Sequence, residues 1–216
     1  ISNNQAGMDS LKVLVLSNNR LEALPNSLGR LTNLRHLELQ SNKITQLPNR
    51  LKDLNSVTTL FLNDNQLRTL PAQIGGMTSL THLALQENKL TTLPPEIGNL
   101  VVLQRLNLQA NYLEQLPDSI GQLSNLVELN ISDNELTSLP TSLGKLRRLQ
   151  KLQLQRNNLH DLPEGLSKLT RLTYLNVRSN KLLSLPELVG QLSNLQQLSM
   201  RDNLLRTLPN SIGDLK

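Results

Sequence analysis

Leucines recur along the chain in a fixed pattern in which apolar and polar positions alternate. The string L-x-x-L-x-L-x-x-N returns every 23 residues, beginning at Leu11, Leu34, Val57, Leu80, Leu103, Leu126, Leu149, Leu172 and Leu195. Its central part, x-L-x-L-x, alternates with period two, which is typical of a short strand with one buried face. The pattern therefore predicts nine successive repeats, each with one short strand in a parallel sheet.

An asparagine occupies the ninth position of every repeat, directly after the predicted strand. The nine residues are Asn19, Asn42, Asn65, Asn88, Asn111, Asn134, Asn157, Asn180 and Asn203. A side-chain amide offers two donors and one acceptor, and a turn buried between repeats needs partners for its backbone groups. We therefore predict a structural ladder in which each asparagine bonds its own turn and the neighbouring repeat.

The second half of each repeat follows the consensus L-x-x-L-P-x-x-[LIV]-G-x-L. Proline suits the start of a short helical or 3-10 turn, and we expect the glycine to lie where the chain bends. Lys52 and Ser167 replace this glycine in two repeats. Because these outer turns are wider than the strands, the stack should curve, with the sheet on its concave face and the turns on its convex face.

The composition agrees with an α/β repeat solenoid. Aromatic residues make up 1% of the chain while hydrophobic residues make up 38%, so the core must consist mainly of leucine. The chain has no cysteine, which excludes disulfides and thiolate metal sites and favours a reducing compartment. We assign residues 11–216 to the nine repeats, and residues 1–10 to a partial N-terminal repeat or the remnant of a cap.

These motifs resemble the 23-residue leucine-rich repeats of the intracellular Ras-group type over residues 11–216. The half-repeat LPPEIGNL at 93–100 carries the most specific part of the resemblance. Similar repeats occur in plant intracellular Ras-group proteins, polarity scaffolds, Roco GTPases and bacterial effectors. The resemblance implies a right-handed horseshoe used for protein recognition, and a cytoplasmic location.

The variable residues of each strand, at the third, fifth, seventh and eighth positions, are expected on the concave face. The candidate partner-binding residues there are His36, Glu38, Phe61, Asp64, His82, Arg105, Lys151, Arg156, Tyr174, Arg178 and Arg201. The only phenylalanine lies among polar neighbours, which is typical of a binding hot spot, although a single exposed aromatic is also normal. The basic residues around Tyr174 form either a site for an acidic partner segment or a solvated positive face.

The seventh position is rich in side-chain amides. It contains Gln40, Asn63, Gln86, Gln109 and Gln155. Such a row can hydrogen-bond the backbone of a ligand, or its members can bond one another from repeat to repeat. The second interpretation is the simpler one.

The sequence offers no convergent chemistry for catalysis or for metal binding. His36 and His82 share a column but are expected two strands apart, roughly 10 Å, which is too far for both to bind one zinc ion. The single glycine of each repeat forms no phosphate-binding loop. We therefore predict a protein that is not an enzyme, that needs no cofactor, and that binds no metal and no small-molecule substrate.

The charge does not indicate a nucleic-acid binder. The net charge is +5, with a local basic run at Lys145, Arg147 and Arg148 that continues at Lys168 and Arg171. Elsewhere the basic residues are interleaved with acids, and stacking aromatics are scarce, which disfavours nucleic acid as the partner. No apolar run approaches the ~18 residues of a membrane span, so no transmembrane segment is predicted.

Together these features predict a non-catalytic module for protein–protein interaction, such as a scaffold or signalling domain. It would bind a protein partner on its concave face. The alternative function is a substrate-recruiting or regulatory arm of a larger enzyme, such as a Roco-type GTPase or a ubiquitin-ligase effector. A second copy of the chain, bound through the concave face or through an uncapped end, is the alternative partner.

Overall fold

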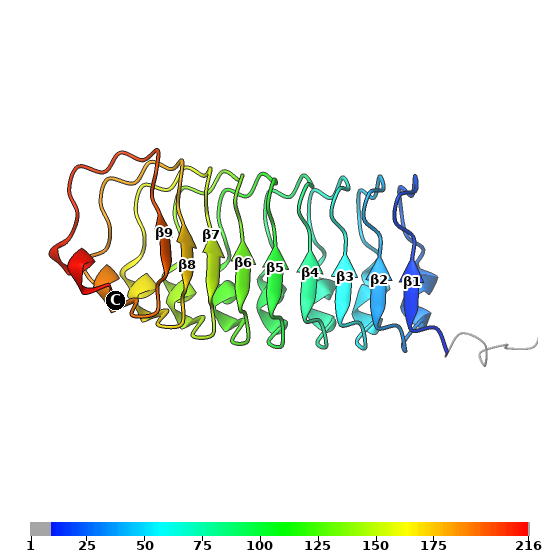
Figure 1. The fold of residues 1–216 in the computed structure, drawn as a ribbon. Helices are drawn as coiled ribbons and strands as arrows, with labels where there is room; N and C mark the ends of the chain where they lie inside the picture. Colours follow the sequence, from blue (N-terminus) through cyan, green and yellow to red (C-terminus); the bar gives the residue numbers. More distant parts are fainter. Residues whose placement is uncertain (1–9, 216) are drawn as a thin grey trace, which may run out of the picture.

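The structure is a computed structural model that describes residues 10–215. In this part of the chain, three-residue strands form one open parallel sheet in which each strand pairs with the next (Figure 1). The strands are β1 (Val13–Val15), β2 (His36–Glu38), β3 (Thr59–Phe61), β4 (His82–Ala84), β5 (Arg105–Asn107), β6 (Glu128–Asn130), β7 (Lys151–Gln153), β8 (Tyr174–Asn176) and β9 (Gln197–Ser199). The predicted nine-repeat solenoid horseshoe is confirmed. The partial repeat predicted over residues 1–10 lies almost entirely outside the described residues.

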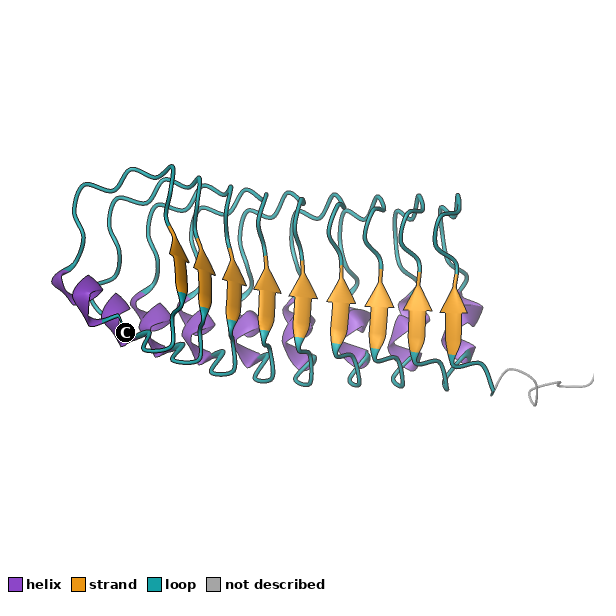
Figure 2. Cartoon of the chain, in the orientation of Figure 1, coloured by secondary structure: helices purple, strands orange, loops and turns teal. Residues whose placement is uncertain are grey.

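A 3-10 turn follows each strand and lies behind the sheet, on the convex side (Figure 2). The turns are η2 (Asn26–Arg30), η3 (Asn49–Asp53), η4 (Ala72–Gly76), η5 (Pro95–Asn99), η6 (Asp118–Gln122), η7 (Thr141–Lys145), η8 (Glu164–Lys168), η9 (Val189–Gln191) and η10 (Asn210–Asp214). All except η9 begin directly after the repeat's proline, whose backbone is extended. The proline therefore sets the entry to the turn, as its fixed φ allows.

The strand register aligns equivalent positions of successive repeats. The middle residue of each strand is a leucine, and Leu37, Leu60 and Leu83 pair in register with at most 2% of their surface exposed. The residues on either side of this leucine point out of the concave face because side chains alternate along a strand. Variable residues of neighbouring repeats therefore lie side by side, roughly 4.8 Å apart.

The asparagine at the ninth position connects neighbouring repeats. The Nδ2 of Asn111 donates to the carbonyl oxygens of Leu85 at 3.0 Å, Leu108 at 3.0 Å and Gln109 at 3.2 Å, and its Oδ1 accepts from the N–H of Leu90 at 2.9 Å. Equivalent bonds to the preceding repeat recur from Asn42 to Asn203. The amide thus satisfies backbone groups that the stacking has removed from water.

The repeat's glycine is required for space and not for a bend. No described glycine has a positive φ; the left-handed residue of each repeat is the non-glycine residue at the eighth position, with φ between 53° and 59°. A Cβ added to Gly121 would lie 2.4 Å from the carbonyl oxygen of Ser142 in the next repeat. The expectation that glycine marks a bend was therefore wrong, because the glycine lets successive 3-10 turns pack closely.

Two repeats lack this glycine, and in each case the turn of the following repeat differs from the consensus. Lys52 faces Gly76, where an added Cβ would lie 2.5 Å from the Cβ of Lys52, so a second glycine in the next turn makes room for the lysine side chain. After Ser167, the next turn is the shortened η9, which begins three residues beyond its proline. Both exceptions are accompanied by a change in the following repeat.

Candidate binding site on the concave face

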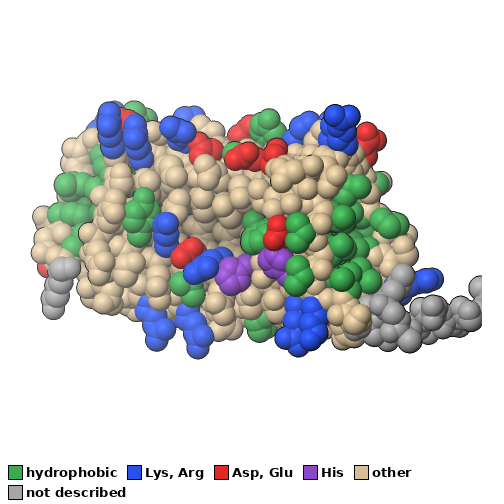
Figure 3. Space-filling view, turned by 45° about the vertical axis from the view of Figure 1, so that its right-hand side comes forward, with side chains coloured by type: hydrophobic (Ala, Val, Ile, Leu, Met, Phe, Trp, Pro, Cys, Tyr) green, Lys and Arg blue, Asp and Glu red, His purple; other side chains and the backbone are tan. Residues whose placement is uncertain are grey.

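An apolar and acidic cluster occupies the N-terminal part of the concave face. The register places Glu38 between Val15 and Phe61, and Val13 and Val15 are about half exposed, at 54% and 53%. Figure 3 shows the histidine side chains beside hydrophobic and acidic ones on this face. The two valines were not among the predicted site residues, although the strand register places Val13 beside His36 and Val15 beside Glu38.

Hydrogen bonds and a ring contact hold this cluster in place. The His36 and Phe61 rings meet edge to face, with centroids 5.5 Å apart and an interplanar angle of 85°. His36 Nε2 lies 2.7 Å from Glu38 Oε1, and Gln40 Nε2 donates to Glu38 Oε2 at 2.9 Å. The hydrogen bond from Gln40 and then that from His36 lower the pKa of Glu38. We call His36, Glu38, Phe61 and Gln40 the Phe61 cluster.

His82 is held in one neutral form by its neighbours. The Thr81 hydroxyl donates its hydrogen to the Thr58 carbonyl at 2.8 Å, so it can only accept from His82 Nδ1, which lies 2.9 Å away. His82 Nε2 is then the acceptor for the Arg105 Nη1 at 3.2 Å. Arg105 Nε in turn lies 3.6 Å from Glu128 Oε2. A polar chain thus crosses β4, β5 and β6 next to the Phe61 cluster.

We expect His82 to stay neutral below the pH at which a free histidine gains its proton. Burial of the ring and then the positive charge of Arg105 lower its pKa. At a pH below about 6.5, His82 binds a proton more readily in the unfolded chain than in the folded one. Protonation therefore favours the unfolded state, and the free energy of unfolding falls as the pH is lowered. An NMR titration should give His82 a midpoint below 6.5 with the proton on Nδ1. A midpoint at or above that value would contradict this arrangement.

A hollow lies between the Phe61 cluster and the basic residues further along the sheet. Its volume is about 450 Å³, and its lining consists of Phe61, His82, Leu83, Ala84, Gln86, Arg105, Leu106, Asn107, Glu128, Leu129, Asn130, Lys151 and Gln153. Buried strand leucines form its floor, while amides and paired charges form its walls. This composition fits a side chain of a partner, with an apolar stem and a polar end.

The basic cluster around Tyr174 consists of Lys151, Arg178 and Arg201. Its net charge is lower than these three cations alone would give. Lys151 Nζ lies 5.5 Å from the centre of the Tyr174 ring, within the range of a cation–π contact. Arg178 Nε donates to Asp202 Oδ2 at 3.1 Å, and Arg201 Nε lies 3.4 Å from Asp202 Oδ1. The hydrogen bond from Arg178 is the main cause that lowers the pKa of Asp202. The two arginines and Asp202 together carry one net positive charge.

Two predicted site residues lie outside both clusters. The Arg156 Nη1 lies 3.1 Å from Asp133 Oδ1 in the preceding repeat, which neutralises its charge. Asp64 is exposed at the end of β3 and forms no ion pair within the described residues. The acidic partners Glu128, Asp133 and Asp202 were not among the predicted site residues. Each of these acids lies 23 or 24 residues from an arginine in the sequence, and this spacing of about one repeat is the signal that could have identified them.

The amides of the seventh position do not bond one another. Within residues 10–215, Gln109 Nε2 donates to Asp133 Oδ2 at 3.2 Å and Gln109 Oε1 accepts from Asn130 at 3.2 Å. The Oε1 atoms of Gln40, Gln86 and Gln155 are buried and have no hydrogen-bond partner in this part of the chain. The interpretation as a self-bonded ladder was therefore wrong.

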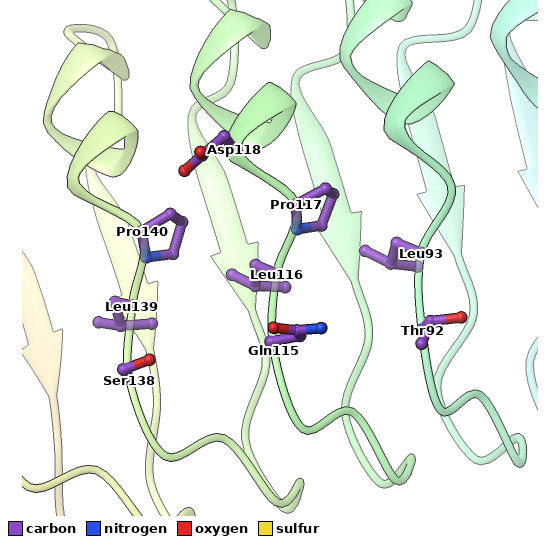
Figure 4. Close-up of a pocket in the computed structure, with 9 residues that line it drawn as sticks. All are labelled: Thr92, Leu93, Gln115, Leu116, Pro117, Asp118, Ser138, Leu139 and Pro140. Atoms are coloured by element: carbon purple, nitrogen blue, oxygen red, sulfur yellow. The ribbon is translucent and has the colours of Figure 1, made fainter.

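A second type of hollow lies on the outer side, between Leu-Pro segments of successive repeats (Figure 4). It measures about 470 Å³ and is lined by Thr92, Leu93, Gln115, Leu116, Pro117, Asp118, Ser138, Leu139 and Pro140. Equivalent residues around Leu24 and Leu47 line a hollow of about 220 Å³ near the start of the solenoid. Because it recurs with the repeat and Asp118 is its only charged residue, it reflects the repeat geometry rather than a specific site.

Neither a metal-binding cluster nor a membrane-spanning helix is found in the described residues. No group of three or more His, Asp or Glu side chains there could hold a metal ion. No helix of that part of the chain is long and apolar enough to cross a membrane.

Two family models match successive parts of the chain. Residues 9–67 match the model described as leucine rich repeat, and residues 77–172 match the one described as leucine-rich repeat region. The chain belongs to the leucine-rich-repeat family. This family is generally a non-catalytic fold for protein interaction, in agreement with the broad functional class that the sequence predicts. The Ras-group type and the cytoplasmic location of this leucine-rich-repeat protein stay predictions.

Several solved leucine-rich-repeat structures are similar to this one. A leucine-rich-repeat protein of Leptospira interrogans has 34% identity and a TM-score of 0.74, with 96% of this chain and 59% of that chain covered. The plant peptide hormone receptor RGFR1, in complex with RGF2, has 28% identity and a TM-score of 0.77, with 98% and 39% covered. The leucine-rich-repeat domain of the type III effector XopL has 28% identity and a TM-score of 0.79, with 94% and 73% covered.

This leucine-rich-repeat chain thus spans 59% of the Leptospira interrogans protein and 39% of the RGFR1 receptor chain. No curated protein sequence matches it.

Proposed function

We propose that this protein recognises a protein or peptide partner on its concave face. The observation that carries the proposal is the Phe61 cluster, in which an aromatic ring and a carboxylate face outward beside an open hollow. His36 and Gln40 already hold these two side chains, so a partner would not have to order them. The structure of RGFR1 with RGF2 gives an example of a similar repeat domain in a complex.

Two anchors on this face would contact the partner. The first anchor is the Phe61 cluster with His82, where Glu38 between Val15 and Phe61 suits a basic side chain with an apolar stem. The second anchor consists of Lys151, Tyr174, Arg178 and Arg201, and it suits an acidic or aromatic group. Phe61 on β3 and Tyr174 on β8 are five strands apart, roughly 24 Å, a distance that about seven extended residues span.

We expect Phe61→Ala to weaken partner binding by about 2 kcal/mol or more, roughly thirtyfold, because the ring is the apolar centre of the first anchor. The fold should be retained, since Phe61 lies on the surface of the sheet and outside the leucine core. The measurement is affinity capture from cell lysate by the wild type and by a Phe61→Ala, Tyr174→Ala double variant. Calorimetry with the captured protein and the single variants follows.

The matched control for this test is Tyr112→Ala, which removes an aromatic ring that is 51% exposed and lies outside the strands. A protein captured by the wild type and by the control, but lost by the double variant, supports binding on the concave face. Equal capture by all three proteins would place the site elsewhere and overturn the proposal.

The second candidate function is a recruiting or regulatory arm of a larger enzyme. It is favoured by the likeness to the leucine-rich-repeat domain of the effector XopL, of which this chain covers 73%. The full-length protein tests this function. If a catalytic domain is joined to these repeats, its activity toward a protein substrate should fall when Phe61 is replaced. Undiminished turnover of that substrate by the Phe61 variant would rule it out.

A further inference from the structure

Five basic side chains gather at the edge of the solenoid where the strands begin, the lower edge in Figure 1. They are Lys145, Arg147 and Arg148, which precede β7, and Lys168 and Arg171, which precede β8, and all are exposed. The chain has 22 basic and 17 acidic residues, so without these five the two numbers would be equal. We call these five residues, which belong to two successive repeats, the basic edge.

The basic edge is ordered but not neutralised. The Arg147 Nη1 donates to the Lys168 carbonyl oxygen at 2.6 Å, which joins the two repeats, and the Arg148 Nη1 donates to Asn125 Oδ1 at 2.6 Å. None of the five side chains forms an ion pair with a carboxylate of the described residues. This contrasts with the concave face, where Arg105, Arg156, Arg178 and Arg201 each pair with an acid. The basic edge therefore keeps its charge available for a partner outside the chain.

Two exposed valines continue the same edge. Val101 and Val102 are 46% and 37% exposed and occupy the positions of Arg147 and Arg148 two repeats earlier. Asn125 lies between them and the basic residues, since its Nδ2 donates to the Val101 carbonyl at 2.7 Å while its Oδ1 accepts from Arg148. One edge therefore presents an apolar pair followed by a row of cations.

We propose that the basic edge and the two valines dock on the surface of an anionic lipid bilayer. The cations would lie on the headgroups, and Val101 and Val102 would reach the boundary with the acyl chains. The cations of successive repeats form a row along one edge, and such a row can contact a broad, uniformly negative surface. A single-stranded nucleic acid would instead call for stacking rings, and the aromatic residues Phe61, Tyr112 and Tyr174 lie elsewhere. Docking by this edge leaves the concave face free for the proposed partner.

Co-sedimentation with vesicles tests this proposal. The wild-type chain should bind phosphatidylcholine vesicles that contain phosphatidylserine, bind pure phosphatidylcholine much less, and be released by salt, which screens exposed charges. A Lys145→Ala, Lys168→Ala, Arg171→Ala variant should lose roughly a hundredfold in partition coefficient, at about fivefold for each cation. These three side chains make no hydrogen bond within the described residues, so the fold should survive, and circular dichroism checks this.

The matched control removes the same charge from the opposite edge. Lys43, Arg68 and Lys181 are exposed beyond the ends of β2, β3 and β8, and their replacement by alanine should change vesicle binding by no more than a few-fold. Equal losses in the two triple variants would show that total charge is responsible and would overturn the proposal.

A Val101→Ser, Val102→Ser variant should reduce vesicle binding while keeping its salt dependence, because it leaves every cation in place. Equal binding to neutral and anionic vesicles would overturn the proposal. So would binding of single-stranded RNA without binding of vesicles. None of these results depends on whether the concave face binds a protein.

Discussion

Replacement of Asn111 by alanine is expected to lower the free energy of unfolding by about 4 kcal/mol. The amide of Asn111, which is 5% exposed, donates to carbonyl groups of two repeats and accepts from the Leu90 N–H. Alanine would leave the Leu90 N–H and the Leu85 carbonyl buried without these partners, and each such group costs about 1–3 kcal/mol. Urea denaturation of the two proteins, followed by circular dichroism, measures the difference.

The control for this prediction is Asn19→Ala at the start of the solenoid. Asn19 has the same place in its repeat, but it is exposed, and among the described residues it donates only to the Leu16 and Ser17 carbonyls of its own turn. We expect a loss below about 1 kcal/mol, as for an ordinary exposed hydrogen bond. Equal losses for Asn19 and Asn111 would mean that the contacts between repeats are not the source of the stabilisation.

Gly121→Ala is expected to destabilise the fold by about 3 kcal/mol, the upper range for a group inserted into a packed interior. The added Cβ would lie 2.4 Å from the Ser142 carbonyl oxygen and 2.8 Å from the Ser142 Cβ, so η6 and η7 would have to separate. The backbone conformation is not the cause, because Gly121 does not have a positive φ. Thermal and urea unfolding should both show the loss.

Gly213→Ala is the matched control for the packing of the turns. Gly213 is the equivalent glycine of the last turn, η10, and a Cβ added there would meet no atom of the described residues within 4 Å. We expect no loss of stability, or a small gain from the reduced freedom of the unfolded chain. A loss at Gly213 as large as that at Gly121 would show that this position needs glycine for its backbone and not for space.

Most of the fold could be predicted from the sequence because each repeat specifies the same local structure. The alternation around Leu37, Leu60 and Leu83 identified strands whose register the structure reproduces. The 23-residue period then determined the order of the sheet, since each strand can pair only with the strands of adjacent repeats. The column positions also placed His36, Glu38 and Phe61 next to one another, because strand spacing is nearly constant.

Only the tertiary structure decided which side chains on the concave face pair with one another and which remain available to a partner. Gln40 holds Glu38, Thr81 determines the protonated nitrogen of His82, and Asp202 takes up both Arg178 and Arg201. These choices depend on rotamers and on distances of a few ångströms between repeats, which a one-dimensional pattern does not contain.

The role of glycine was decided in the same way. Its pattern in the sequence suggests a bend, but the distance from Gly121 to Ser142 in the next repeat shows close packing of the turns. By itself, the sequence determined the repeat, the strands and the face on which variable residues lie, because these follow from local periodicity. The contact between adjacent turns and the pairing of Arg105, Arg156 and Arg178 with acids came only from the assembled stack, because these contacts join residues about one repeat apart.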